Sequence, residues 1–136
     1  MKQVLILHYH EIWLKGGNKK YFLSRLRDAI RQSVADLPVA SLAGVSERLI
    51  LTPGDEAVLP QFIERLRRVF GLAYIALARE VPSALEALAP AACEMMAEAN
   101  PRNFAVRAKI ADSAYPMNSM DVERALGRVV LEPRAR

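Results

Sequence analysis

Basic side chains gather in two segments of this sequence. The segment from Lys15 to Arg31 contains six lysines and arginines and one acidic residue, Asp28. The second cluster has three basic residues and no acid: Arg102, Arg107 and Lys109. The chain as a whole carries a net charge of only +4, so an anion-binding surface is expected at these two segments rather than everywhere.

The first cluster follows a helical spacing. Apolar residues from Phe22 to Leu37 recur at steps of three and four, which predicts an amphipathic helix capped by Asn18 and stopped by Pro38. Four residues share the stripe opposite Phe22 and form a basic ridge: Lys20, Ser24, Arg27 and Arg31. Lys15, Lys19 and the Gly16-Gly17 turn flank the helix start, where backbone N–H groups favour phosphate. A solvated helix face is the alternative interpretation, and the charge pattern by itself favours it.

Residues able to perform catalysis or bind metal are scarce. The chain has two histidines and one cysteine, from which no nucleophile, base and orienting group can be assembled. His8 and His10 are placed on one side of the first strand and could share a metal, but a stable site normally needs roughly three or four ligands. Cys93 lies in an apolar helical setting that favours a buried side chain. The sequence therefore predicts no catalytic residue, no metal site and no cofactor.

The elements that must position these residues form two groups. The chain has 136 residues, 52% of them apolar, enough for one core or two small ones. The first 80 residues predict strand, helix, strand, strand, helix, strand, the ferredoxin-like βαββαβ arrangement. The expected strands are Val4–Tyr9, Val39–Val45, Glu47–Thr52 and Ala73–Arg79, and the second helix starts near Val58 and ends by Gly71.

The second group begins at the Val81-Pro82-Ser83 break. A helix capped by Ser83 runs to Asn100, and a last helix capped by Ser119 closes the chain. Between them, residues 103–110 alternate apolar and basic, which predicts a strand with a positive open face and an unpaired edge. A lone cysteine and the lack of a long apolar stretch predict a soluble, cytoplasmic protein with no membrane contact.

Residues 9–22, YHEIWLKGGNKKYF, resemble the opening motif of the tRNA 4-thiouridine sulfurtransferases, also called thiamine-biosynthesis sulfurtransferases. That family pattern reads RYGEIxLKGKNRxxF, so His8 and His10 stand in place of Arg and Gly. Val69-Phe70-Gly71 resembles the family's turn after its second helix. Residues 104–109 and 115–119, with Leu126-Gly127, are similar to the THUMP module that follows, where Ile110 replaces a frequent basic residue.

The resemblance implies an α+β chain with a ferredoxin-like domain over residues 1–80 and an incomplete THUMP-like module over residues 81–136. It implies binding to the acceptor end of tRNA without the catalytic ATP pyrophosphatase domain, so the chain itself is expected not to be an enzyme. The adenylation and sulfur transfer of the family would need a separate catalytic chain. The RNA-binding residues, from the matched motifs and the two basic clusters, are Lys15, Asn18, Lys19, Lys20, Arg27, Arg31, Arg102, Arg107, Lys109, Tyr115 and Pro116.

The alternative function is a protein-interaction module that no longer binds RNA. The unpaired edge of the 103–110 strand is open to a second chain, which favours a homodimer under this hypothesis.

Overall fold

The structure is a computed structural model that describes residues 2–10, 17–45, 47–110 and 114–134. The chain divides into two compact units, which we call unit 1 (residues 1–80) and unit 2 (residues 81–136). Each unit is described by itself. No helix in the described part of the chain is long and apolar enough to cross a lipid bilayer.

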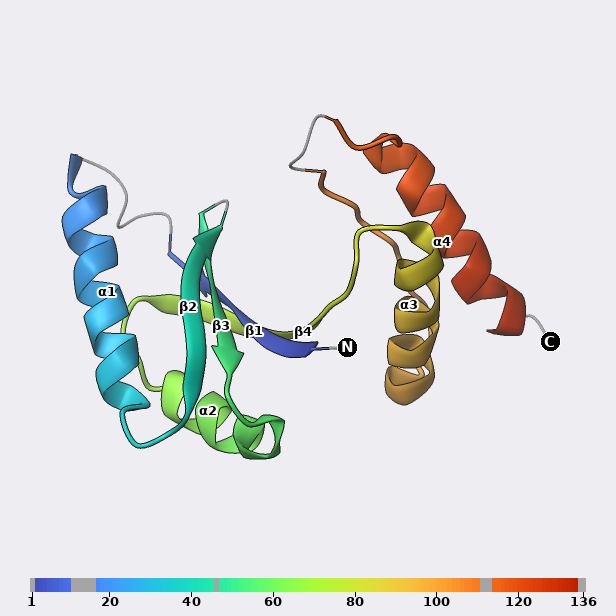
Figure 1. Ribbon diagram of the computed structural model, residues 1–136. Helices are drawn as coiled ribbons and strands as arrows, with labels where there is room; N and C mark the ends of the chain where they lie inside the picture. The colour runs from blue at the N-terminus through green and yellow to red at the C-terminus, as the bar shows by residue number, and fades with distance from the viewer. Residues whose placement is uncertain (1, 11–16, 46, 111–113, 135–136) are drawn as a thin grey trace. The chain divides into compact units, whose positions relative to one another are not determined.

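Unit 1 has the element order that the sequence predicts, and its four strands form one antiparallel sheet in the order β2-β3-β1-β4 (Figure 1). This is the ferredoxin-like arrangement. The elements are β1 (Lys2–Tyr9), α1 (Lys19–Ser33), β2 (Val39–Val45), β3 (Arg48–Pro53), the 3₁₀ turn η2 (Glu56–Val58), α2 (Leu59–Leu66) and β4 (Leu72–Glu80).

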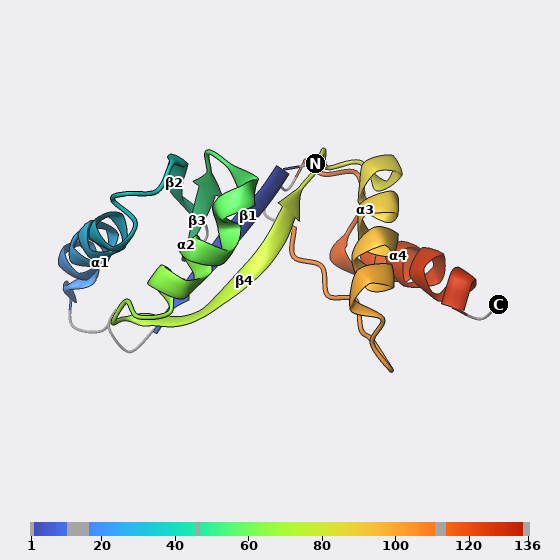
Figure 2. The same cartoon turned by 90° about the horizontal axis from the view of Figure 1, so that it is seen from below.

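The core of unit 1 lies between one sheet face and the two helices. Alternation along β1 turns Leu5 and Leu7 to this face, where Leu51 and Leu49 are their partners on β3. Leu26 and Ile30 of α1 and three residues of α2 complete the same cluster: Leu59, Phe62 and Leu66. Figure 2 shows α1, α2 and the strands of this unit from below. The core therefore fixes which side of α1 remains open to solvent.

The ends of the unit 1 helices differ in detail from the predictions. Asn18 occupies the N-cap position of α1 as expected, but its side chain makes no capping hydrogen bond. The second helix ends at Leu66 rather than near Gly71. Gly71 has a φ of +103°, a conformation that costs glycine little and other residues much, so the chain turns there into β4.

An arginine joins the two helices of unit 1. Arg65 of α2 donates two hydrogen bonds to the carboxylate of Asp36, at 2.5 and 2.8 Å, and a third to the Ser33 carbonyl at 3.2 Å. The hydrogen bonds from Arg65 lower the pKa of Asp36 to about 2. This contact ties α2 to the end of α1 and so helps to set the position of the basic helix.

The described residues of unit 2 form two helices, α3 (Leu85–Ala99) and α4 (Ser119–Arg134). Both predicted caps are wrong by one residue. Ala84, in an extended conformation, precedes α3 with no side-chain cap, so Ser83 does not serve. At α4 the Asn118 Oδ1 accepts a hydrogen bond from the Asp121 N–H at 2.8 Å, so Asn118 caps the helix in place of Ser119.

The predicted strand at residues 103–110 is wrong, because these residues have no regular secondary structure and belong to no strand ladder among the described residues. Its alternation is as expected, since Phe104, Val106 and Ala108 are half-buried whereas Arg107 and Lys109 are exposed. The described residues of unit 2 include no strand, because a strand exists only through hydrogen bonds to a neighbouring strand. The segment is instead held to α4 by a hydrogen bond from the Ala108 N–H to Glu123 Oε1, 3.0 Å.

Candidate RNA-binding surfaces

The basic ridge of α1 is partly open to solvent. Lys20 and Arg31 are exposed, as the helical spacing predicts. Arg27 is half-buried, and its guanidinium lies over Gly44 of β2, where an added Cβ would come within 2.7 Å of Arg27 Nη2. The absence of a side chain at Gly44 thus lets Arg27 lie along the sheet. Lys20 and Arg31 are the ridge cations most accessible to a partner.

The start of α1 carries further predicted residues. Lys19 Nζ lies 3.9 Å from Glu47 Oε1, and both side chains are largely exposed, at 48% and 64%. Such a long, exposed pair contributes little and leaves Lys19 accessible. Asn18 is exposed at the helix start. Lys15 lies outside the described residues.

In unit 2 the structure brings together three of the predicted residues. Lys109, Tyr115 and Pro116 line one groove of about 560 Å³. The Tyr115 hydroxyl donates a hydrogen bond to the Ser83 carbonyl at 2.6 Å, which links the residues before α4 to the residues before α3. The groove is lined by a cation, Lys109, and by an aromatic ring, Tyr115, features suited to a phosphate and sugar backbone.

The two arginines of the second cluster lie differently. Arg107 is exposed, donates to the carbonyl of Val106 at 3.2 Å, and lines a neighbouring cavity of about 500 Å³ together with Lys109 and Tyr115. Arg102 is also exposed, but it lines neither cavity. The structure therefore groups Arg107 with the Lys109 and Tyr115 surface and separates Arg102 from it.

His8 makes an aromatic contact that the sequence did not predict. Its ring stacks on Tyr74 of β4, with centroids 4.0 Å apart and planes 16° from parallel. Burial lowers the pKa of His8, and the positive charge of Arg48 lowers it further. The register of the ladder between β1 and β4 shifts after His8, and β1 ends at Tyr9, so His10 lies outside the strand. Within the described ranges no group of three or more His, Cys, Asp or Glu side chains could hold a metal ion.

Cys93 is half-buried in α3. Its Sγ lies 3.8 Å from the carbonyl oxygen of Val129 in α4, a weak hydrogen-bond contact. The residue packs between the two helices of unit 2 as a small side chain.

The sequence analysis did not identify a groove on the other side of α1. It has a volume of about 920 Å³ and is bordered by Tyr21, Arg25 and Phe70. Both aromatic rings are strongly exposed, at 67% for Tyr21 and 79% for Phe70. The sequence held one indication of this groove. Tyr21 lies on the polar side of an amphipathic helix, where an aromatic side chain does not pack into the core. The packing partner of α1 across the groove could not be inferred from periodicity.

Comparison with known families decides the relationship. Residues 4–76 match the ThiI ferredoxin-like domain, and residues 83–136 match the THUMP domain. The chain belongs to the ThiI ferredoxin-like family. The family resemblance inferred from the sequence motifs is therefore confirmed, and so is the α+β fold with its ferredoxin-like and THUMP parts.

Curated relatives of this ThiI-type chain are much longer than it is. It is 33% identical over 132 residues to the probable tRNA sulfurtransferase of Caldanaerobacter subterraneus subsp. tengcongensis, with 97% of this chain and 34% of that protein covered. It is 30% identical to the probable tRNA sulfurtransferase of Staphylococcus aureus strain Newman, with 94% of this chain and 32% of that protein covered. The chain thus spans about a third of the length of these relatives.

Two solved structures share the fold of the ThiI-type chain. One is a 4-thiouridine synthetase in complex with RNA and bound ATP, 27% identical, with a TM-score of 0.78 over 98% of this chain and 34% of that one. The other is PH1313 from Pyrococcus horikoshii Ot3, 23% identical, with a TM-score of 0.77 over 96% of this chain and 44% of that one. The second similarity establishes the fold alone.

Proposed function

We propose that the chain binds the acceptor end of tRNA and positions it for a 4-thiouridine or thiamine-biosynthesis type sulfurtransferase. In this proposal residues 1–80 act as the ferredoxin-like domain and residues 81–136 as a partial THUMP module. The supporting observation is that both units carry exposed cations. The chain is also similar, over 98% of its length, to a 4-thiouridine synthetase whose crystal structure contains RNA. Duplex RNA is recognised through phosphates, 2′-hydroxyls and shape, which requires positive surfaces of this kind.

The contacting residues in this proposal come from both basic clusters. Lys20 and Arg31 of the ridge, with Lys19 at the helix start, face the phosphates of one stretch of backbone. Lys109 and Arg107 do the same from unit 2, with Tyr115 holding the groove wall in place. The remaining proposed contacts are Lys15, Asn18, Arg27, Arg102 and Pro116. Among the described ones, Arg27 is the least accessible cation.

Catalysis is assigned elsewhere in this proposal. The curated relatives are tRNA sulfurtransferases of about three times this length, so the adenylation and sulfur transfer would be performed by sequence outside these 136 residues or by a separate catalytic chain. The expected location in this proposal is the cytoplasm. One cysteine cannot form a disulfide within the chain, and proteins of the reducing cytoplasm rarely have disulfides.

The test is the salt dependence of tRNA binding in a matched pair of variants. Lys20→Ala/Lys109→Ala removes one cation from each proposed surface. Arg67→Ala/Arg128→Ala removes the same charge from exposed positions outside both. For a duplex, each phosphate contact contributes about 0.9 to the magnitude of the slope of the logarithm of the binding constant against the logarithm of the salt concentration. We therefore expect the first variant to reduce the magnitude of this slope by about 1–2. Equal losses in the two variants, or no tRNA binding at ~50 mM salt, would contradict the proposal.

A homodimer is the second candidate, and one observation favours it. Residues 103–110 keep the alternation of a strand but have no partner strand in the described part of unit 2. An open edge of this kind can pair with the same segment of a second chain. Light scattering after size exclusion at several concentrations tests the idea, and a strict monomer at the highest concentration excludes it.

A further inference from the structure

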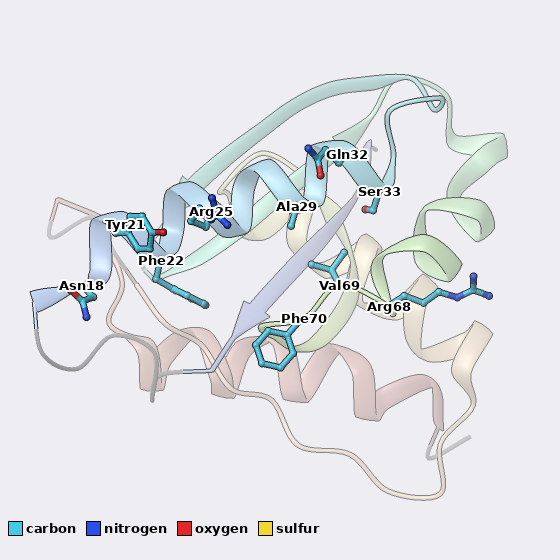
Figure 3. A pocket seen from close by; sticks show the side chains of 10 residues that line it. All are labelled: Asn18, Tyr21, Phe22, Arg25, Ala29, Gln32, Ser33, Arg68, Val69 and Phe70. Atoms are coloured by element: carbon cyan, nitrogen blue, oxygen red, sulfur yellow. The ribbon is translucent and has the colours of Figure 1, made fainter.

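A groove runs along the side of α1 that the basic ridge does not occupy. It separates the helix from the residues that follow α2 (Figure 3). Its volume is about 920 Å³, at the large end of ligand-sized clefts, and it is open to solvent. The lining residues are Asn18, Tyr21, Phe22, Arg25, Ala29, Gln32, Ser33, Arg68, Val69 and Phe70. All of them belong to unit 1, so the groove is complete within one compact body.

Two aromatic rings border the groove from opposite sides. Tyr21 comes from α1 and Phe70 from the turn before β4, and they are 67% and 79% exposed. The floor between them is apolar, since Phe22, Ala29 and Val69 are half-buried. A flat aromatic π-face is the surface on which nucleobases stack.

The charges of the groove are positive. Arg25 lies with its Cζ 5.9 Å from the Tyr21 ring centroid, and no carboxylate in the described ranges forms an ion pair with it. Arg68 lines the opposite wall and donates to Glu64 Oε1 at 2.8 Å, a carboxylate that it shares with Arg67. None of the described lining residues is an aspartate or glutamate. The groove therefore combines exposed rings with net positive charge.

We propose that this groove binds unpaired nucleotides of an RNA, with bases stacked on Tyr21 and Phe70 and phosphates beside Arg25 and Arg68. The proposal rests on the RNA-binding function proposed above and adds a second, chemically different contact to it. A duplex keeps its base faces in its own stack, so exposed rings gain nothing from a paired stem. A single strand presents base faces and phosphates together, which matches the two kinds of side chain that border the groove. Asn18 and Gln32 add amide groups that can hydrogen-bond to base edges or sugars.

The experiment compares three RNA probes on the full chain: a blunt hairpin, the same hairpin with a four-nucleotide 3′ overhang, and the same hairpin with a four-nucleotide 5′ overhang. The variants are Tyr21→Ala, Phe70→Ala and the double substitution. Tyr74→Ala serves as the control, because Tyr74 is an aromatic residue of unit 1 that is 58% exposed and lies outside the groove lining. Circular dichroism and thermal melting establish that each variant is folded.

We expect the wild-type chain to prefer at least one overhang probe over the blunt hairpin. Each groove substitution should weaken binding of that probe about 10-fold, because loss of one stacking ring costs on the order of one factor of ten. The same substitutions should change blunt-hairpin affinity by less than about 2-fold, and Tyr74→Ala should change neither. A 2-aminopurine base in the overhang should lose fluorescence on binding to the wild-type chain and keep it with the double variant.

Several outcomes would overturn the proposal, and they are separable from failure of the tRNA-binding function. If the blunt hairpin binds in a salt-dependent way but overhangs give no gain, RNA binding stands and the groove is not a nucleotide site. The same holds if Tyr21→Ala and Phe70→Ala weaken all three probes equally. If an acidic peptide binds and is lost in these variants while overhang RNA binding is unchanged, the groove is a protein site. If none of the RNA probes binds at ~50 mM salt, both proposals fail.

Discussion

Unit 1 and unit 2 place their basic residues by different means. In unit 1 every strand is paired, and α1 lies on a continuous core of residues such as Leu5, Ile30 and Phe62, each fully buried. In unit 2 the extended segment 103–110 has no ladder among the described residues and is held by a side-chain contact from Glu123. The backbone that carries the cations of unit 1 is thus fixed by a packed core, whereas Arg107 and Lys109 lie on a segment held by the Glu123 hydrogen bond and by half-buried apolar side chains. The difference predicts unequal responses to similar substitutions.

The largest expected effect is a core truncation in unit 1. Phe62 has no exposed surface and contacts the sheet and α1 cluster, so Phe62→Ala should lower the free energy of unfolding by about 3–5 kcal/mol. Val122, which is 6% exposed in α4, is a buried position of unit 2 with a smaller side chain. Val122→Ala removes two methyl groups and should cost about 1.5 kcal/mol at ~0.8 kcal/mol for each.

Urea denaturation followed by circular dichroism measures both changes. Hydrogen exchange then locates them, with loss of protection expected in β1 and β3 for Phe62→Ala and in α3 and α4 for Val122→Ala. Equal costs would contradict the contrast drawn above, because Val122→Ala removes far fewer buried atoms than Phe62→Ala and would then be the more costly change for each atom removed.

Two glycines sharpen the comparison, because the same substitution should have opposite signs. At Gly71 the φ is +103°, and a Cβ would lie 3.3 Å from Phe22 Cζ and 3.4 Å from Leu26 Cδ1. Gly71→Ala should therefore destabilise by about 1–3 kcal/mol. Gly127 lies within α4, where the nearest atom to an added Cβ is Val106 Cγ2 at 3.9 Å. Gly127→Ala should stabilise by about 0.5–1 kcal/mol, because alanine loses less backbone entropy in a helix.

Thermal melting of the two alanine variants beside the wild-type chain measures these shifts. A lower melting temperature for Gly127→Ala would mean that α4 packs more tightly there than the structure describes. A neutral Gly71→Ala would mean that the turn before β4 tolerates a conformation other than the left-handed one.

The smallest expected effect is a pH dependence confined to unit 1. Burial holds the pKa of His8 below its ordinary value of 6.5, so the unfolded chain binds more protons than the folded chain near that pH. Stability from this group is present above pH 6.5 and is lost as the pH falls through that value toward the folded pKa. His8→Phe keeps a ring to stack on Tyr74 but cannot titrate.

Melting temperatures between pH 7.5 and 5.5 check this prediction. The wild-type chain should lose more stability than His8→Phe over that interval. Parallel curves for the two proteins would show that His8 protonation is not coupled to folding.

The predictability of the strands in unit 1 varied with their composition, yet all four formed. Val4–Tyr9 is apolar and β-rich, so β1 was clear from the sequence, and it extends to Lys2. The segment Val39–Val45 is rich in alanine, serine and glycine and has weak strand propensity, but it pairs with β3 along its length and buries Leu42 against Leu51. Pairing with a strong neighbour therefore compensated for weak propensity.

The candidate site shows the same division between local and long-range information. The spacing of Lys20, Arg27 and Arg31 predicts one helical stripe, and all three are indeed on α1. Their accessibility depends on the sheet, because Gly44 leaves room for the Arg27 guanidinium to pack over β2. Tyr115 was expected only as a motif residue, and the structure gives it a hydrogen bond to Ser83, 32 residues earlier in the chain.

The sequence by itself determined the order of the elements, the two basic clusters and the family motifs, because these depend on neighbours within a turn of helix or along a strand. The tertiary structure decided which of the cations are open, that residues 103–110 have no ladder partner in the described ranges, and that Phe70 and Tyr21 line one groove. Those features arise where residues far apart in the chain pack together. Side-chain volume and burial select such contacts, and periodicity carries no record of them.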